Sequence, residues 1–160
     1  MEIHMKKLKL LGLTTALVLA GVTVWAETAD PFADIVETRH GLMMQMAADV
    51  GKMGAMVKGD APYDAATAAR AAANVVAIAS VISLDQFPAG SEQGKSADSS
   101  AKPELWATPD DFLAKLGDLN TAAEALKTAA ATNPDALKSG ISALGKACGA
   151  CHSAYRASQG

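Results

Sequence analysis

Helix-start signals constrain the fold of this chain more than any other feature of its sequence. In the strong form of the signal, a side chain that can cap a helix stands directly before a proline. The three strong examples are Asp30-Pro31, Thr108-Pro109 and Asn133-Pro134. Asp60, two residues before Pro62, is a weaker version. The side-chain oxygen of the capping residue accepts a hydrogen bond from a backbone N–H of the first turn. Proline is tolerated at the first helical position because the N–H that it lacks would have no partner within the helix there. These four starts predict four helices.

Apolar residues follow each start at spacings of three and four, as expected for helices with one buried face. We expect helices over residues 31–57, 62–83, 109–131 and 134–157. Their apolar faces are Met43, Met46, Val50, Met53 and Val57; Ala65, Ala68, Ala72, Val75, Ala79 and Ile82; Phe112, Leu116, Leu119, Ala123 and Leu126; and Leu137, Ile141, Leu144, Cys148, Cys151 and Tyr155. The pattern predicts an all-α fold, an antiparallel four-helix bundle.

One connection in this bundle is long. The crossover between the second and third expected helices, residues 84–107, holds Pro88, Gly90, Gly94, Pro103 and a Ser/Asp/Ala-rich stretch. It cannot be one regular element, although residues 103–106 could form a single helical turn. A loop of this length in a small domain often covers a functional site.

The N-terminus carries the pattern of a secretory signal. Lys6, Lys7 and Lys9 precede an apolar run over residues 10–24, and Ala26 stands where a signal peptidase would cut. We expect residues 1–26 to be removed, which leaves one domain over residues 27–160. An uncleaved anchor is the alternative, but the apolar run is short for a membrane span.

The charge balance excludes some partners. The chain has 14 basic and 17 acidic residues, and removal of residues 1–26 would leave a net charge of about −5. A mildly acidic domain without a basic patch is a poor binder of nucleic acid. No second long apolar run follows, so we expect no membrane span in the mature protein.

The two cysteines of the chain lie in a chemically informative motif. Cys148 and Cys151 are followed by His152, and C-x-x-C-H is the attachment signature of c-type haem. The thiols add to the vinyl groups of the porphyrin, and the imidazole binds the iron. On a helix all three side chains share one face. A redox disulfide pair would stand at the start of a helix after a strand, and a zinc site would need another ligand. A disulfide across so small a loop would stabilise little.

Beyond this motif, the mature chain resembles the cytochrome c prime family, the class II c-type cytochromes, over nearly its full length. The matching segments are residues 39–43 (Arg-His-Gly-Leu-Met), 59–66 (Gly-Asp-Ala-Pro-Tyr-Asp-Ala-Ala), 102–106 (Lys-Pro-Glu-Leu-Trp) and 148–156. The resemblance implies a four-helix bundle with one covalent haem c near the C-terminus, in an exported bacterial protein of the periplasm.

The resemblance also implies a set of residues around the haem. Arg39 would contact a haem propionate, Phe87 and Trp106 would pack at the haem edge, and Arg156 would lie near His152. His40 stands where the family commonly has Gln.

The sixth iron position separates functions within this family. Some members leave it open behind a bulky apolar residue, and low-spin relatives place a methionine there, which in this sequence is Met43. Methionine is also a common core residue. Met46 faces the same seam one turn further on, and His40 is a rival ligand one turn before. An open site is the further alternative.

Three functions follow from these alternatives. The first is a periplasmic electron carrier with His152 and Met43 as axial ligands, and the second is a protein that binds nitric oxide or another small gas at an open iron. The third, a haem-free helical module, leaves residues 148–152 unexplained. The chain shows no Ser/His/Asp arrangement and no paired inward carboxylates, so we expect that it is not an enzyme.

We expect the partners to be redox proteins. Because this chain is acidic, it should favour partners that have a basic docking face. Family members often dimerise through their first helices. Val36, Met44 and Met56 lie off the main apolar face and could serve such a homodimer.

Overall fold

The computed structural model describes residues 29–158. The expected signal peptide over residues 1–26 and its cleavage site lie outside the described residues. Four long α-helices make up most of the described chain, namely α1 (Ala33–Lys58), α2 (Ala65–Val81), α4 (Pro109–Ala130) and α5 (Pro134–Tyr155). The crossover adds a 3-10 turn, Leu84–Gln86, and one short α-helix, α3 (Glu104–Ala107). The predicted four-helix architecture is therefore confirmed.

The helix starts agree with the sequence signals in part. Asn133 caps α5 as predicted, because its side chain accepts a hydrogen bond from the N–H of Ala136 at 2.9 Å. Thr108 stands at the N-cap of α4 but makes no side-chain capping bond. The prediction for α2 is wrong in detail, since the helix begins after Asp64, whose Oδ1 accepts from the N–H of Thr67 at 2.7 Å. Asp60 instead follows the left-handed Gly59 that ends α1.

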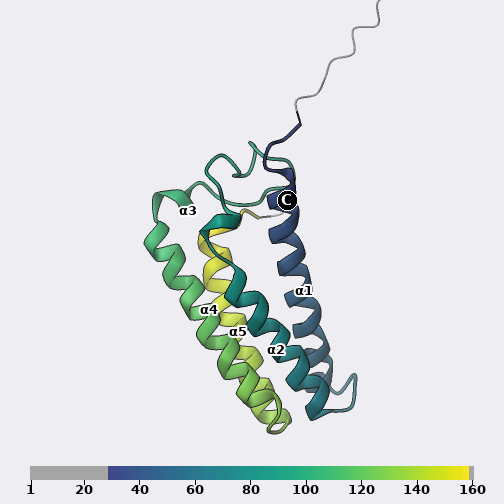
Figure 1. The fold of residues 1–160 in the computed structure, drawn as a ribbon. Coiled ribbons are helices and arrows are strands. Elements are labelled where there is room, and N and C mark those ends of the chain that lie inside the picture. Colours follow the sequence, from purple (N-terminus) through teal and green to yellow (C-terminus); the bar gives the residue numbers. More distant parts are fainter. Residues whose placement is uncertain (1–28, 159–160) are drawn as a thin grey trace, which may run out of the picture.

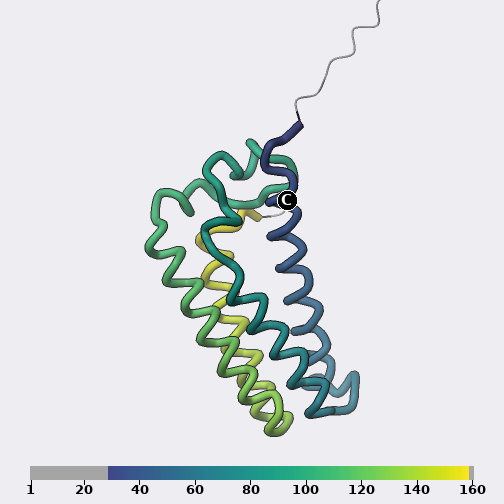
Figure 2. The backbone as a smooth tube through the Cα atoms, viewed as in Figure 1, coloured from purple at the N-terminus to yellow at the C-terminus, as the bar shows by residue number. Residues whose placement is uncertain are grey.

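The four long helices run antiparallel around one core (Figures 1 and 2). α1 packs on α2, α2 on α4, α4 on α5, and α5 on α1, so each helix has two main neighbours. The α4–α5 interface is the most extensive and the α1–α5 interface the least. The start of α1 and the end of α5 lie at the same end of the bundle, where the crossover also lies (Figure 1).

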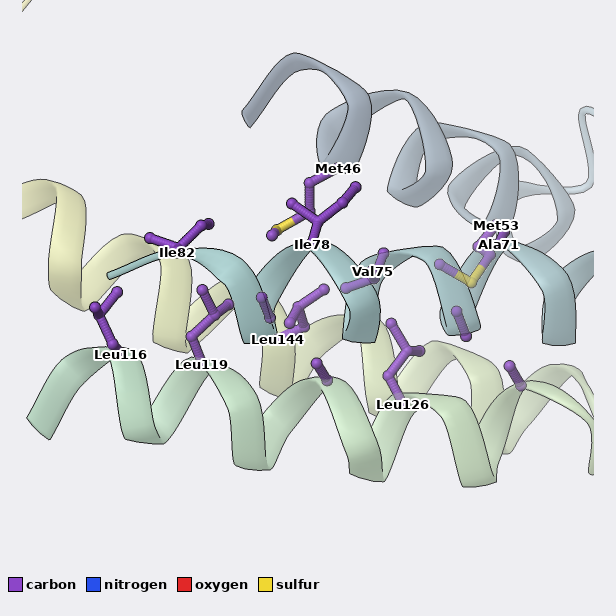
Figure 3. Packing of buried hydrophobic residues seen from close by; sticks show 14 of the residues in the cluster. Met46, Met53, Ala71, Val75, Ile78, Ile82, Leu116, Leu119, Leu126 and Leu144 are labelled. Carbon is purple, nitrogen blue, oxygen red and sulfur yellow. The ribbon is translucent and has the colours of Figure 1, made fainter. Parts of the chain in front are cut away.

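Most of the core comes from the predicted apolar faces, and Ala71, Ile78 and Ala130, which were not predicted, are buried with them. Figure 3 shows Met46 of α1 directed towards Ile78 of α2, and Leu116 and Leu119 of α4 directed towards α2 from the other side. Every predicted face residue of α4 is buried. The faces of α1 and α5 are less completely buried than that of α4. Met43 of α1 and Cys148 and Cys151 of α5 are only half-buried against this core.

No helix within residues 29–158 combines the length and the apolar character that crossing a membrane requires.

Candidate functional site

The last two turns of α5 carry the cysteine–histidine motif. Cys148 follows the fully buried Leu144 by four residues, and Cys151 precedes the buried Tyr155 by four. Because residues three and four apart share a helix face, the two thiols are directed along the same inward seam. Cys148, Cys151 and His152 are all half-buried, and the cysteines are free thiols, not a disulfide.

The local environment adjusts the acidity of all three groups. Burial raises the pKa of the Cys148 and Cys151 thiols, although the positive charge of Lys115 acts in the opposite direction on Cys151. Burial also lowers the pKa of His152, and the positive charge of Arg156 lowers it further. Both effects favour the neutral imidazole, which is the form that binds a metal.

Two methionines and a histidine were the candidates for the opposite face of the iron. Met43 is half-buried and packs against the core, and Met46 is buried deeper in it. His40 is exposed. Since α1 and α5 are antiparallel, Met43 lies in the half of α1 that is closest to the end of α5 carrying His152 (Figure 1). Of the three candidates, the half-buried Met43 has the placement expected of an inward ligand near that end.

Arg39, one turn before Met43, is buried and bound to the crossover. Its Nη1 donates to the carbonyl of Gln86 and to Ser91 Oγ, both at 3.0 Å. Its Nη2 donates to the carbonyl of Ser91 at 3.0 Å and to Ser99 Oγ at 2.6 Å. Burial lowers the pKa of its guanidinium. Among the described residues it forms no ion pair, and its Nε–H makes no hydrogen bond, so one N–H is left for an anion.

The two predicted haem-edge aromatics lie next to each other. Trp106 on α3 donates its indole N–H to the carbonyl of Phe87 at 2.9 Å, and both side chains are half-buried against the core. The carbon CZ of Arg39 lies 4.8 Å from the centroid of the Phe87 ring. The structure thus brings three predicted site residues, from α1, the crossover and α3, to the same end of the bundle as the cysteines.

Arg156 lies just beyond α5 and is exposed. It borders a shallow surface groove together with Gly149, His152 and Ser153. It lies beside His152, and its charge acts on the imidazole as described above.

Sequence reasoning missed one buried charge. Asp49 on α1 is fully buried and accepts hydrogen bonds from Lys52 and Gln45, both at 2.9 Å, and from Asn74 of α2 at 3.3 Å. Burial alone would raise the pKa of Asp49, but these bonds and the nearby Lys52 charge outweigh it and hold the pKa below its usual value. Asp49 stands three residues after Met46 and four before Met53, and this spacing could have placed it on the buried face of α1.

The crossover also has polar contacts that the sequence did not predict. Ser91, Ser96 and Ser99 are buried, and Ser96 donates its hydroxyl to Asp30 at 2.7 Å. Such contacts depend on the folded path of the loop, which has no periodic pattern to indicate it.

The residues present fit a covalent haem. Two free thiols and an imidazole, all half-buried, stand within five residues of one another on the last two turns of α5. Half-buried apolar side chains, Met43, Phe87 and Trp106, offer the apolar walls that a flat macrocycle needs. In residues 29–158, no three His, Cys, Asp or Glu side chains are grouped so as to hold a metal ion by themselves.

Comparison with known proteins identifies a group of relatives. A family model described as cytochrome C' matches residues 34–156. Cytochrome c-554 of Cereibacter sphaeroides is 43% identical over 152 residues, covering 95% of this chain and 98% of that protein. Cytochrome c-556 of Agrobacterium fabrum is 36% identical over 149 residues, covering 93% and 97%.

Solved structures show the same likeness. A cytochrome c' from Rhodobacter sphaeroides superposes with a TM-score of 0.75 at 30% identity, covering 79% of this chain and 97% of the other. A ferrous variant of cytochrome c prime from Alcaligenes xylosoxidans with bound NO has a TM-score of 0.70 at 31% identity, covering 83% and 100%. A cytochrome c' described as having an unusual ligand-controlled dimer dissociation has 0.70 at 28%, covering 78% and 95%.

Proposed function

Because the chain belongs to the cytochrome c' family, as the match over residues 34–156 shows, we propose that it is an exported electron carrier with His152 and Met43 as iron ligands. It binds haem c covalently, as its family does. In this proposal the attachment points are Cys148 and Cys151. Bound haem supplies an iron that alternates between the ferric and ferrous states.

One observation carries this assignment. Two free thiols and a half-buried imidazole lie on the last two turns of α5, and a half-buried thioether lies on α1 in the antiparallel half that approaches the end of α5. Each of the two helices would thereby contribute one ligand to the haem iron.

The properties of the two ligands suit electron transfer. Methionine sulfur is soft and neutral, so it favours the ferrous state and raises the reduction potential. Both ligands stand on long helices that pack into one core, and this rigid support holds their spacing nearly constant when the charge on the iron changes. With Met43 and His152 both bound to the iron, the protein would leave no coordination position open for a substrate.

The surrounding residues are assigned supporting roles. Arg39 would direct its remaining N–H to a haem propionate, since a buried cation without a carboxylate partner stabilises a nearby anion. Phe87 and Trp106 would form the apolar wall, Met46 would fill the core below the ring, and Arg156 would lie at the exposed edge near His152. His40, which is exposed, would stand beside Arg39 without binding the iron.

The test is the absorption spectrum of the haem-loaded protein with matched variants of α1. We expect low-spin bands and a weak charge-transfer band of sulfur-ligated ferric haem in the parent protein. Met43→Ala should abolish the charge-transfer band and permit rapid carbon monoxide binding to the reduced form. His40→Ala and Met46→Leu are the matched controls and should keep the band. A parent protein that lacks the band and binds carbon monoxide rapidly would reject Met43 as ligand.

A second candidate function is gas binding at an open iron. It is favoured by the relative from Alcaligenes xylosoxidans, whose structure contains bound NO. In this alternative Met43 would be a core residue that covers the distal face without binding the iron, and the same spectrum separates the two functions.

Membership of the same family also suggests where the protein is located and what it binds. We expect export to the periplasm, redox proteins as partners, and no role in catalysis. A homodimer through α1 would use Met44, which is 60% exposed, together with the partly buried Met56. Val36 is buried inside the bundle, with 4% of its surface exposed, and does not contribute to such an interface.

A further inference from the structure

The spacing between α1 and α5 at the cysteine end needs a structural explanation. These two helices carry the proposed iron ligands, yet they pack against each other less than any other neighbouring pair of long helices. Direct contact between them therefore constrains their distance weakly. Whatever bridges them at the level of Met43 and His152 determines how far apart the two ligands stand.

A run of rings crosses the bundle at this level. The Arg39 guanidinium lies on the Phe87 ring, 4.8 Å from its centroid. The Phe87 ring meets Phe112 of α4 edge-on, with 5.1 Å between centroids and 71° between planes. Phe112 meets Tyr155 of α5 in the same way, at 5.4 Å and 86°. Edge-to-face pairs of this geometry attract beyond the area that they bury.

The run begins and ends beside the proposed ligands. Arg39 is four residues before Met43, and Tyr155 is three residues after His152, so each lies on the adjoining turn of its helix. The Tyr155 hydroxyl is fixed by Asp111 at 2.5 Å and by Thr108 at 2.8 Å, both at the start of α4. Thus both ends of the run are held in place.

A second connection runs through the crossover backbone. Arg39 donates to Ser99 Oγ at 2.6 Å, and Ser99 donates to the carbonyl of Ser91 at 2.5 Å. Within three residues of Ser99, the loop binds the end of α5. The N–H of Ala157 donates to the carbonyl of Ser100 at 2.8 Å, and the N–H of Lys102 donates to the carbonyl of Tyr155 at 2.9 Å. The buried guanidinium on α1 is thereby tied to the end of α5.

We propose that these two connections form a cross-bundle bridge, made of Arg39, Phe87, Phe112, Tyr155 and residues 99–102, that sets the distance between the two iron ligands. The inference rests on the proposed function, because it takes Met43 and His152 as those ligands. Phe112 and Ser99 are positioning residues in it, because they act through the helices that carry the ligands. The loop engages both terminal nitrogens of the buried Arg39, Nη1 and Nη2, and these four bonds fix the rotation of α1 at this level.

The test uses the haem-loaded protein and one variant in each connection. Phe112→Leu removes both ring pairs, and Ser99→Ala removes the hydroxyl that Arg39 binds. We expect each variant to weaken the sulfur charge-transfer band and to speed carbon monoxide binding by the reduced form by roughly 2- to 10-fold, the order of the effect that aromatic pairs and hydrogen bonds have on an equilibrium. Amide exchange over residues 39–46 should rise by a similar factor.

Two control variants remove comparable groups outside the bridge. Leu126→Val shrinks a buried side chain of the same helix, α4, at its other end. Ser96→Ala removes another buried loop hydroxyl, which binds Asp30 and not Arg39. Both should destabilise the protein while keeping the band, the carbon monoxide rate and the exchange over residues 39–46.

The outcomes separate the bridge from the ligand assignment. If Phe112→Leu and Ser99→Ala lower the melting temperature as the controls do, but leave exchange over residues 39–46 unchanged, the bridge is overturned. If the parent protein itself shows an open iron, the ligand assignment fails, and exchange over residues 39–46 still decides whether the bridge fixes α1 against α5.

Discussion

The two ends of this bundle are built differently. At the end where α1 passes into α2 and α4 into α5, several core side chains are completely excluded from water. We call this the packed end, defined by Met53, Ala68, Leu126 and Leu137, each with 0% of its surface exposed. At the opposite end, the ligand end, Met43, Phe87, Trp106, Cys148, Cys151 and His152 are all half-buried.

This difference separates stability from chemistry. The packed end consists of small and aliphatic side chains that interdigitate, and such packing supplies most of the stability of a helical bundle. The ligand end replaces part of that packing with polar bonds to the crossover and with soft and titratable groups. Consequently, substitutions at the packed end should change the unfolding free energy, whereas substitutions at the ligand end should change the haem spectrum.

The largest effect on stability is expected at the packed end. Leu137→Ala should lower the free energy of unfolding by about 2–5 kcal/mol, because it leaves a cavity at a fully buried site. The low-spin spectrum of the haem-loaded protein should stay the same. Urea unfolding and an absorption spectrum of one preparation test both parts. A spectral change as large as that of Met43→Ala would show that the two ends are not separable.

The buried Asp49 lies between the two ends and should give the next largest effect. Asp49→Asn should cost about 1–3 kcal/mol at neutral pH, the value of hydrogen bonds to a charged group. Because the folded protein holds the pKa of Asp49 below 3.8, this stabilisation is present above that pH and is lost as the pH falls further.

Urea unfolding from pH 7 down to pH 2.5 measures this dependence. The parent protein should lose stability below about pH 4 more steeply than Asp49→Asn does. Parallel curves for the two proteins would mean that Asp49 has an ordinary pKa in the fold.

The cap of α2, at the packed end, should give an effect of about 1 kcal/mol. Asp64→Ala removes the side-chain bond to the N–H of Thr67 and should destabilise the protein by that amount. Asp60→Ala is the matched control, since Asp60 does not cap the helix, and it should leave the melting temperature nearly unchanged. A larger loss of stability in Asp60→Ala than in Asp64→Ala would instead support the start of α2 that the sequence predicted, next to Asp60.

The smallest change in stability is expected at the ligand end. Trp106→Phe keeps an aromatic ring but removes the hydrogen bond from the indole to the carbonyl of Phe87, worth about 1 kcal/mol or less at a half-buried site. Its haem absorption bands should nevertheless shift more than those of Leu137→Ala. Thermal unfolding and visible spectra of both variants test whether Trp106→Phe loses less stability than Leu137→Ala and yet shows the larger spectral shift.

The sequence predicts the packed end better than the ligand end, for physical reasons. Helical period and capping side chains are local properties, so the four long helices and much of their buried faces follow from residue spacing, although Val36, Ala71 and Ile78 are buried without having been predicted. Asp64 was missed as a cap because the proline signal at Pro62 stands two residues too early. Asp49 was missed because a carboxylate three residues from Lys52 has the appearance of a solvated helix charge.

At the ligand end, the motif over residues 148–152 identifies the attachment chemistry by itself. The partners of Arg39 do not follow from the sequence, because Gln86, Ser91 and Ser99 are 47 to 60 residues away and reach it only through the folded path of the crossover. The contact between Phe87 and Trp106 likewise depends on that path. Such contacts between distant segments have no periodic signature.

The mass of the exported protein tests the central claim, that a haem is bonded through thioether links to α5. Protein made in cells with haem-attachment machinery and recovered from the periplasm should have the mass of residues 27–160 plus one haem, and peptides containing Cys148 and Cys151 should retain it after denaturation. A bare polypeptide with free or bridged thiols would contradict the account.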